Sequence, residues 1–316
     1  MASKHTTSEA QINSLILDKL GLQLTDIEGV PSGEISETYF ISTDSEQLVL
    51  RIAHPKLRDT LYKDHYVSTC LVSKSVPVAE FVQLGDFEGG TYCVSRRAEG
   101  VILTDLDQET FAGLVPTLVD TLDEIHHSDI TDTSGFGSFD RNGEGRFSSW
   151  HEYLLAVGLE ETQEPGFYGR WYKLFDEGIL ERDLFFRLYD ELKERVLDIP
   201  PVRSLVHADY GFDNVLATPH RVTAVIDWAN ACFGDHLFDV ARMQMLQPEW
   251  QFEQHFRERY SARGEELPGY ANRLWCYYVY MLLDGMRFYA QTRQPDGYKW
   301  LVDKAVMAGL IKADQT

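Results

Sequence analysis

Residues 204–227 restrict the fold of this chain more than any other stretch, because they carry a strand pattern inside a half that is otherwise helical. The runs "SLVH", "NVLAT" and "RVTAVIDW" are short and rich in β-branched residues, which favours strands. Pro219-His220 separates the last two runs, where a turn is expected. We therefore predict a hairpin with Ala217 and Val222 on either side of its turn.

This hairpin carries polar groups into a segment that otherwise has a buried pattern. The stretch "LVHADYGFDN", residues 205–214, contains side chains that are costly to desolvate. In the predicted register Asn214 lies opposite about Val225, so Asp227 is one or two residues away at the open end of the hairpin. Asp209 lies on the incoming loop, five residues before Asn214. We expect these three oxygen-bearing side chains to converge.

The converging groups are the minimum equipment for phosphoryl transfer. One carboxylate and one amide oxygen suit Mg²⁺, which takes few protein ligands and completes its octahedron with water and phosphate oxygens. The other carboxylate is then available to accept a proton or orient a hydroxyl. The alternative is that these residues only cap helices or form turns, as single Asp and Asn residues in loops usually do. For His207 we expect a role in orienting the backbone rather than in proton transfer.

The remainder of the chain divides into a strand-rich and a helical part. Ser8 and Gly21 have the character of the start and stop of a helix. Two hairpins follow, "TYFIS" with "QLVLRIA" and "EFVQLG" with "TYCVSRR", and a helix from about Leu61 to Ser73 lies between them. From Gln108 onward the apolar spacing is helical, and residues 204–227 are the one β segment that we expect there.

Composition excludes several classes of protein. The net charge of −21 repels nucleic acid and anionic membranes, and it allows a cationic partner or simply aids solubility. No Gly-x-Gly-x-x-Gly follows a strand, which argues against a dinucleotide enzyme, and the four cysteines lack metal spacing. No stretch approaches the roughly 20 apolar residues of a membrane span, and "MASKHTTSEA" lacks the apolar core of a signal peptide. We expect a cytoplasmic protein, and a monomer.

The motifs resemble those of the aminoglycoside phosphotransferase family. His207-Ala208-Asp209, then four residues and Asn214, followed later by Ile226-Asp227-Trp228, match its two linked motifs. Within the family, "YKDHYV", "TYCVSRRAEGVILTDL" and "TSGFGSF" are similar to the hygromycin B phosphotransferases, and the likeness fades after about Met245. The resemblance implies an α+β, bilobal, protein-kinase-like fold. Residues 1–98 would form a small antiparallel-sheet N-lobe with one inserted helix, which binds nucleotide. Residues 99–316 would form a larger, mostly helical C-lobe for catalysis and acceptor binding.

The resemblance also implies roles for individual residues. Asp209 would orient or deprotonate the acceptor hydroxyl, while Asn214 and Asp227 would hold Mg²⁺ on the nucleotide phosphates. Arg51 replaces the usual lysine that contacts the phosphates, a contact that its planar, permanently charged group can make. Asp64 would be its acidic partner; the alternative is an ordinary surface ion pair.

Two further segments are implied to contact ATP. In "GEISETYF", Gly33 would permit a close approach and Ser36 would donate to phosphate, unless the stretch is a plain hairpin turn. In "SRRAEG", backbone groups of Arg96 and Ala98 are expected to pair with the adenine edge.

A cationic small-molecule acceptor would pair with acidic groups. We name Asp235 and Asp284 as candidates for this pairing and Trp250 as a candidate for the pocket wall. The alternatives are that Asp235 caps the helix beginning at His236, that Asp284 is simply solvated, and that Trp250 belongs to the core.

The function implied by the resemblance is ATP- and Mg²⁺-dependent phosphorylation of an aminoglycoside, hygromycin B, which gives antibiotic resistance. One alternative is a kinase of a small metabolite such as choline, homoserine or a sugar. Another is a kinase-like binding module without catalysis, which would be expected to lack Asp209, Asn214 or Asp227. All three are present.

Overall fold

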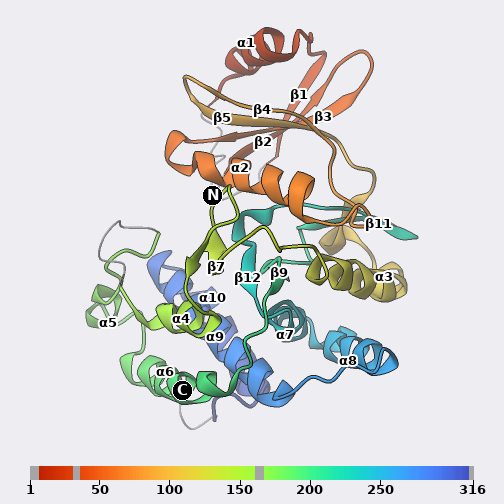
Figure 1. The fold of residues 1–316 in the computed structure, drawn as a ribbon. Coiled ribbons are helices and arrows are strands. Elements are labelled where there is room, and N and C mark those ends of the chain that lie inside the picture. The colour runs from red at the N-terminus through yellow and green to blue at the C-terminus, as the bar shows by residue number, and fades with distance from the viewer. Residues whose placement is uncertain (1–6, 31–35, 161–166, 313–316) are drawn as a thin grey trace. The chain divides into compact units, whose positions relative to one another are not determined.

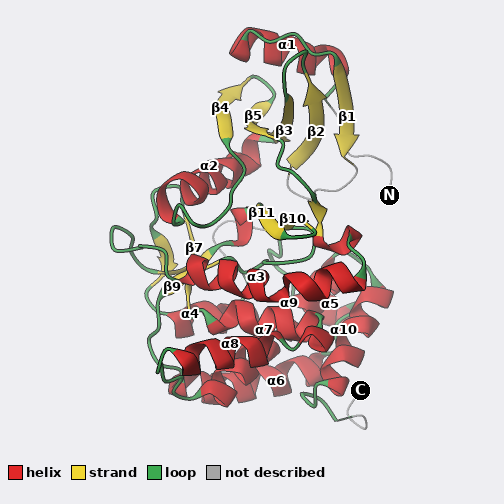
Figure 2. Cartoon of the chain, turned by 90° about the vertical axis from the view of Figure 1, so that its right-hand side faces the viewer, coloured by secondary structure: helices red, strands yellow, loops and turns green. Residues whose placement is uncertain are grey.

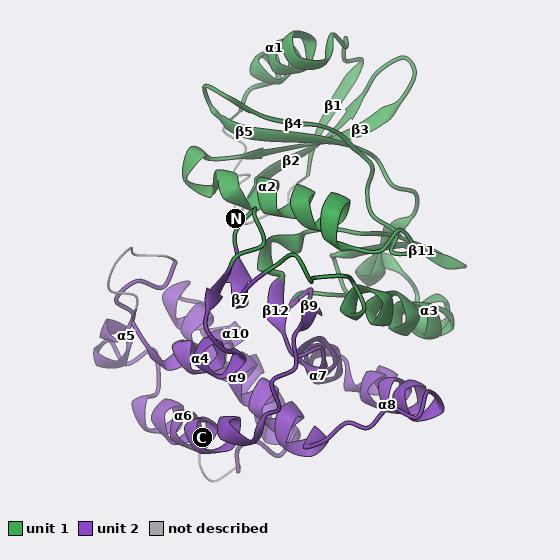
Figure 3. Cartoon of the chain, viewed as in Figure 1, with its two compact units in different colours: residues 1–133, 140–144, 209–231 green, residues 134–139, 145–208, 232–316 purple. Residues whose placement is uncertain are grey.

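The computed structural model describes residues 7–30, 36–160 and 167–312, which divide into two compact units (Figure 3). Unit 1 consists of residues 1–133, 140–144 and 209–231, and unit 2 consists of residues 134–139, 145–208 and 232–316. The loop with Asp209 and the hairpin after it therefore pack in the same unit as the N-terminal sheet. The functional division expected at residue 98 stays a prediction, since it concerns roles rather than packing.

Unit 1 contains a five-stranded antiparallel sheet in the order β1-β2-β3-β5-β4 among its described residues. A smaller sheet follows, in the order β11-β10-β6. The elements of unit 1 are α1 (Glu9–Leu20), β1 (Asp26–Val30), β2 (Ser36–Ser42), β3 (Gln47–Ala53), α2 (Arg58–Tyr66), β4 (Phe81–Phe87), β5 (Gly90–Arg96), β6 (Val101–Ile102), α3 (Gln108–His126), β10 (Val215–Thr218) and β11 (Arg221–Val225). Both predicted N-terminal hairpins and the helix inserted between them are confirmed.

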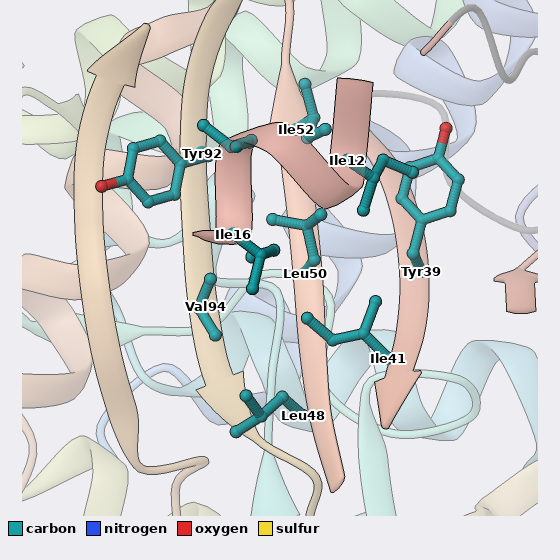
Figure 4. Close-up of a cluster of buried hydrophobic side chains, with 10 residues drawn as sticks. Ile12, Ile16, Tyr39, Ile41, Leu48, Leu50, Ile52, Tyr92 and Val94 are labelled. Carbon is teal, nitrogen blue, oxygen red and sulfur yellow. The ribbon is translucent and has the colours of Figure 1, made fainter. Parts of the chain in front are cut away.

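Helix α1 forms where its caps predict. The Ser8 side chain accepts a hydrogen bond from the Gln11 amide, the Gln11 Oε1 accepts one from the Ser8 amide, and Gly21 ends the helix at φ 71°. The buried stripe of α1 packs on one face of the large sheet, as Figure 4 shows for Ile12 and Ile16 above Leu50 and Val94. This packing fixes which face of each strand is the core face.

Strand alternation then directs Arg51 to the other face of the sheet. Leu50 and Ile52 belong to the core under α1, so the side chain between them points away from it. On that opposite face Cys93, the partner of Arg51 in β5, packs with Leu61 of α2. Figures 1 and 2 show α1 and α2 on opposite sides of the strands. Arg51 therefore faces α2.

The linker after β5 approaches the hairpin closely. Gly100 has φ 90°, and a Cβ atom there would lie 2.1 Å from the Ala217 carbonyl oxygen. Glycine is required at this position because both the backbone angle and the close approach exclude a side chain. Strand β6 begins at the next residue, Val101, and pairs with β10.

Unit 2 is mostly helical but also has a four-stranded sheet in the order β8-β7-β12-β9. Its elements are β7 (Phe136–Phe139), β8 (Gly145–Phe147), α4 (Trp150–Leu155), α5 (Lys173–Asp176), α6 (Arg182–Arg195), β9 (Ser204–Val206), β12 (Cys232–Gly234), α7 (Leu237–Leu246), α8 (Phe252–Ala262), α9 (Tyr270–Gln291) and α10 (Pro295–Met307). The prediction that 204–227 is the one β segment of this half is wrong, since β7, β8 and β12 also pair. These strands have three or four residues, too few to show a period of two.

All four cysteines are free thiols, with Cys70 exposed and the others buried. In the described part of the chain, no helix combines the length and the apolar character needed to cross a bilayer.

Candidate functional site

The hairpin β10–β11 places Asn214 beside the end of β11. Val215 pairs with Val225, and the Ile226 amide donates to the Asn214 carbonyl at 3.0 Å. The predicted partner of Asn214, Val225, is therefore wrong by one residue. A bulge between Leu216 and Ala217 shifts the register, although Ala217 and Val222 do flank the turn as predicted.

Asp209 and Asn214 are joined within the loop. The Asn214 Nδ2 donates to the Asp209 carbonyl oxygen at 2.9 Å, which turns the Oδ1 of the amide away from that contact. Asn214 is buried, and Asn230 Nδ2 lies 3.4 Å from the Asp209 carboxylate. The structure thus joins Asn214 to the backbone of Asp209 within unit 1, while the convergence of all three side chains stays a prediction.

Asp239 fixes the backbone that leads into Asp209. Its two carboxylate oxygens accept from the amides of His207 and Ala208 at 2.9 and 2.7 Å, and Asp239 is fully buried. Ala208 has φ 61°, a left-handed conformation that costs energy for a residue with a side chain. Sequence reasoning missed Asp239; the only signal is an acid in the first turn of a helix after "FGDH".

Arg51 and Asp64 form an ion pair within unit 1. The side chain of Asp64 is 4% exposed and that of Arg51 is 19% exposed, so the alternative of an ordinary surface pair does not describe them. Burial alone would lower the pKa of Arg51, but the charges of Asp64 and Asp227 raise it above its ordinary value. The guanidinium stays protonated, and the Asp227 carboxylate is near enough to act on it.

Asp64 also reaches the segment that carries Asp227. Its Oδ1 accepts from the Trp228 amide at 3.2 Å. Asp227 has φ 59° and begins the 3₁₀ turn Trp228–Asn230, in which the Asp227 carboxylate accepts from the Ala229 amide at 3.4 Å. Lys63, which sequence reasoning missed, donates to carbonyl oxygens of the same segment.

One cavity of about 720 Å³ in unit 1 brings most of the predicted residues together. Its lining includes Ser36, Arg51, Asp64, Arg96, Ala98, Asn214 and Asp227, which lie up to 191 positions apart in the sequence (227 − 36). This volume is in the range of small-molecule sites. Gly33 lies outside the described residues.

Arg96 lines this cavity, and its amide and its side chain both have partners within the protein. The Arg96 amide donates to the Glu80 carbonyl at 2.8 Å, and its side chain pairs with Glu46 and Glu80. The amide hydrogen of Arg96 is therefore already in use.

The oxygen donors at Asn214 and Asp227 fit a hard cation. An amide oxygen and a carboxylate are suitable ligands for Mg²⁺, which needs few groups from the protein. Clusters of three or more His, Cys, Asp or Glu side chains that could hold a metal ion are not found within 7–30, 36–160 and 167–312.

The three predicted acceptor residues lie in unit 2 in different surroundings. Trp250 is half-buried in the 3₁₀ turn Pro248–Trp250. The carboxylate of Asp284 is 39% exposed and pairs with Arg287 at 2.6 Å. A groove of about 1140 Å³ along α8 is lined by none of Asp235, Trp250 and Asp284.

The buried carboxylate of Asp235 connects the start of α7 to α9. It is fully buried, accepts from Nε and Nη2 of Arg273 at 2.7 and 2.6 Å and from the Tyr277 hydroxyl, and caps the Leu237 amide at 3.0 Å. Burial alone would raise the pKa of Asp235, but the Arg273 hydrogen bonds lower it below its ordinary value. Helix α7 begins at Leu237 rather than at His236, and its N-cap residue is His236. Asp235 accepts from the first amide of this helix, and its oxygens are occupied.

A family model for the phosphotransferase enzyme family, abbreviated APH, matches residues 26–276. The chain belongs to this family. Hygromycin-B 4-O-kinase from Escherichia coli is 32% identical over 282 residues, which cover 89% of this phosphotransferase and 79% of that protein.

Solved structures agree with the family. A thermostable mutant of aminoglycoside phosphotransferase APH(4)-Ia, in ternary complex with ADP and hygromycin B, is 31% identical. Its TM-score is 0.78, and the match covers 93% of this chain and 96% of that one. Spectinomycin phosphotransferase APH(9)-Ia shares the fold at 13% identity, with a TM-score of 0.64 and coverage of 96% and 98%. The predicted family is confirmed, as is the fold class with its antiparallel N-terminal sheet and helical C-terminal part.

Replacing Asp235 by Asn tests its structural role in this phosphotransferase. Loss of the buried carboxylate leaves Arg273 uncompensated, and we expect the free energy of unfolding at pH 7 to fall by about 3 kcal/mol. Because the folded-state pKa of Asp235 is lowered, the ion pair contributes fully above about pH 4 and is lost as the pH falls through the folded-state value. Urea unfolding at pH 7 and pH 3 measures both effects.

The matched control is Asp303→Asn. Asp303 forms an exposed pair with Lys299, so its loss should cost at most about 0.5 kcal/mol. A stable Asp235→Asn variant with a raised KM for an acceptor would contradict the structural role.

Proposed function

We propose that this phosphotransferase transfers the γ-phosphoryl group of ATP to a hydroxyl of hygromycin B, using Mg²⁺, and thereby inactivates the antibiotic. The observation that carries the proposal is the cavity of unit 1, because seven residues named from the motifs and from the family resemblance line it. The relatives named for hygromycin B support the choice of acceptor.

Arg51 is proposed to bind the nucleotide phosphates. Its guanidinium is planar and permanently charged, and the ion pair with Asp64 holds it in place at the cavity wall. Ser36 would add a hydroxyl donor from β2. The Arg96 carbonyl and the backbone of Ala98 would pair with the adenine edge.

Asn214 and Asp227 are proposed to hold Mg²⁺ through the amide Oδ1 and the carboxylate. When bound, the ion would neutralise charge on the phosphate oxygens during transfer. The hydrogen bond from Asn214 Nδ2 to the Asp209 carbonyl sets the direction of the amide. The left-handed backbone at Asp227 sets the direction of the carboxylate.

Asp209 is proposed as the catalytic base. The acceptor hydroxyl oxygen forms a bond to the γ-phosphorus while the bond from that phosphorus to the β–γ bridging oxygen breaks. ADP leaves, and the hydroxyl proton passes to the Asp209 carboxylate. Asp239 accepts from the two amides before Asp209, and these contacts restrain the backbone from which the Asp209 carboxylate extends.

Asp284 is our candidate for binding an ammonium group of the acceptor. Its carboxylate is partly exposed. Burial is the largest cause of the raised pKa values of Tyr153, Tyr168 and Tyr280, and the negative charge of Asp284 raises these pKa values further. A carboxylate among tyrosine hydroxyls suits an aminated sugar. Trp250 stays a candidate for an apolar wall, whereas Asp235 is left out since its oxygens are occupied. The net charge of −21 would attract such a cation.

Because ATP is the proposed donor, we also propose that the enzyme acts in the cytoplasm. We further propose that it acts as a monomer, because a net charge of −21 opposes self-association.

The first test is ATP consumption by the purified protein with and without hygromycin B. We expect turnover only with the antibiotic, and a product one phosphate heavier by mass spectrometry. Asp209→Asn should lower kcat about 1,000-fold, because general-base catalysis contributes on that order. Asp44→Asn, an exposed carboxylate in the β2–β3 turn, is the control. Turnover with choline, homoserine or a sugar instead would replace the acceptor, and full activity of Asp209→Asn would remove its role.

Metal dependence tests Asn214. Chelation should abolish turnover, and added Mg²⁺ should restore it. Asn214→Ala removes one oxygen ligand, so we expect the half-saturating Mg²⁺ concentration to rise at least about tenfold. Asn13→Ala on the exposed side of α1 should leave it unchanged. An unchanged Mg²⁺ requirement in Asn214→Ala would exclude this ligand.

Asp284→Asn tests the acceptor site. Loss of one ion pair with an ammonium group should raise the KM for hygromycin B about tenfold, while the KM for ATP stays unchanged. Initial rates at varied antibiotic and ATP concentrations separate the two constants. Asp303→Asn serves as a control from α10, and thermal melting shows whether Arg287 without its partner destabilises the fold. Equal changes in both KM values would count against Asp284.

A further inference from the structure

Lys63 of α2 is buried in unit 1 at 6% exposure. Burying an ammonium group is costly unless its donors are used. Its Nζ donates to the Ala229 carbonyl oxygen at 2.9 Å and to the Ala231 carbonyl oxygen at 2.6 Å. Hydrogen bonds from a charged donor are stronger than those from a neutral donor, so we expect Lys63 to stabilise the position of the segment that contains Ala229 and Ala231.

The segment that Lys63 contacts is the short turn that follows Asp227. It begins at Asp227, runs through the 3₁₀ turn Trp228–Asn230, and closes where the Ala231 amide donates to the Trp228 carbonyl at 3.0 Å. At its start the Trp228 amide donates to Asp64 Oδ1. At its end Lys63 supplies the donors. Two adjacent residues of α2 therefore hold the two ends of the turn with groups of opposite charge.

Lys63 acts without lining the cavity itself. Thr60, Leu61, Asp64 and Ser68, from α2 and the π-helical turn that continues it, line the cavity, whereas Lys63 points to the turn after Asp227. Because Asp64 also pairs with Arg51, α2 connects the proposed phosphate contact to the proposed metal ligand.

We propose that Lys63 is a positioning residue, which ties α2 to residues 227–231 so that Asp227 and the Arg51–Asp64 pair keep one fixed arrangement. The consequence for ATP and Mg²⁺ rests on the proposed function. The claim that Lys63 immobilises the turn does not.

Lys63→Met is the decisive variant, because it keeps the apolar stem and removes the donors. We expect amide hydrogen exchange in residues 228–231 to become at least about tenfold faster. The KM for ATP and the half-saturating Mg²⁺ concentration should each rise about tenfold, while the KM for hygromycin B stays within twofold of the wild type. Lys63→Arg keeps charge and donors and should recover most of the exchange protection. Lys56→Met, at an exposed lysine of the same unit, is the matched control.

Wild-type exchange and wild-type KM for ATP in Lys63→Met would overturn the proposal. An equal rise in both KM values with a lower melting temperature would also overturn it, since that indicates general destabilisation. If Lys63→Met does not fold, Lys63→Gln, which retains two shorter donors, is measured by the same exchange experiment. If the wild type fails to phosphorylate hygromycin B, the proposed function is wrong. Hydrogen exchange then still decides whether Lys63 holds the turn.

Discussion

The carboxylate of Asp64 is the group on which the arrangement of unit 1 depends. One oxygen accepts from the Trp228 amide, and the other pairs with Arg51 from the large sheet. A single buried anion thus connects α2, β3 and the turn after Asp227, which come from distant parts of the sequence. Its burial is tolerable because its partners supply a full charge and a backbone donor, and loss of either partner would leave it costly. Because Asp64 and its partner Arg51 both line the cavity, their ion pair sets the position of this part of the cavity wall.

Other buried acids hold backbone in the same manner. Asp239 accepts from two consecutive amides, and Asp235 combines a helix cap with an ion pair to Arg273. The excess of acidic residues in the chain is therefore not only a property of its surface. Carboxylates suit this role because they accept several hydrogen bonds at once and are too short to adopt many alternatives. Where such a carboxylate is fully used, as in Asp235, it is a poor candidate for binding a ligand.

The sequence predicted the elements with strong local signals and missed contacts made by the fold. Capping residues and alternating strands located α1 and both N-terminal hairpins. Motif spacing named Asn214 and Asp227, and the family resemblance named five further residues that line the cavity. The register at Asn214 was wrong by one because a bulge has no clear sequence signature here. Lys63 and Asp239 were missed because their partners are backbone groups, which every residue possesses. A pattern of side chains alone does not reveal such contacts.

The left-handed residues of the 208–227 region show why these anchors are needed. Ala208, Phe212 and Asp227 all have positive φ, a conformation that costs about 1 kcal/mol or more for each such residue. Each has an anchor close by: Asp239 accepts from the Ala208 amide, the Leu103 amide donates to the Phe212 carbonyl at 2.9 Å, and Asp64 and Lys63 hold the turn that begins at Asp227. Without these contacts the chain would relax, and the carboxylates of Asp209 and Asp227 would turn with it. The anchors therefore restrain the backbone at both acids, and in the function proposed above this leaves little reorganisation for the reaction itself.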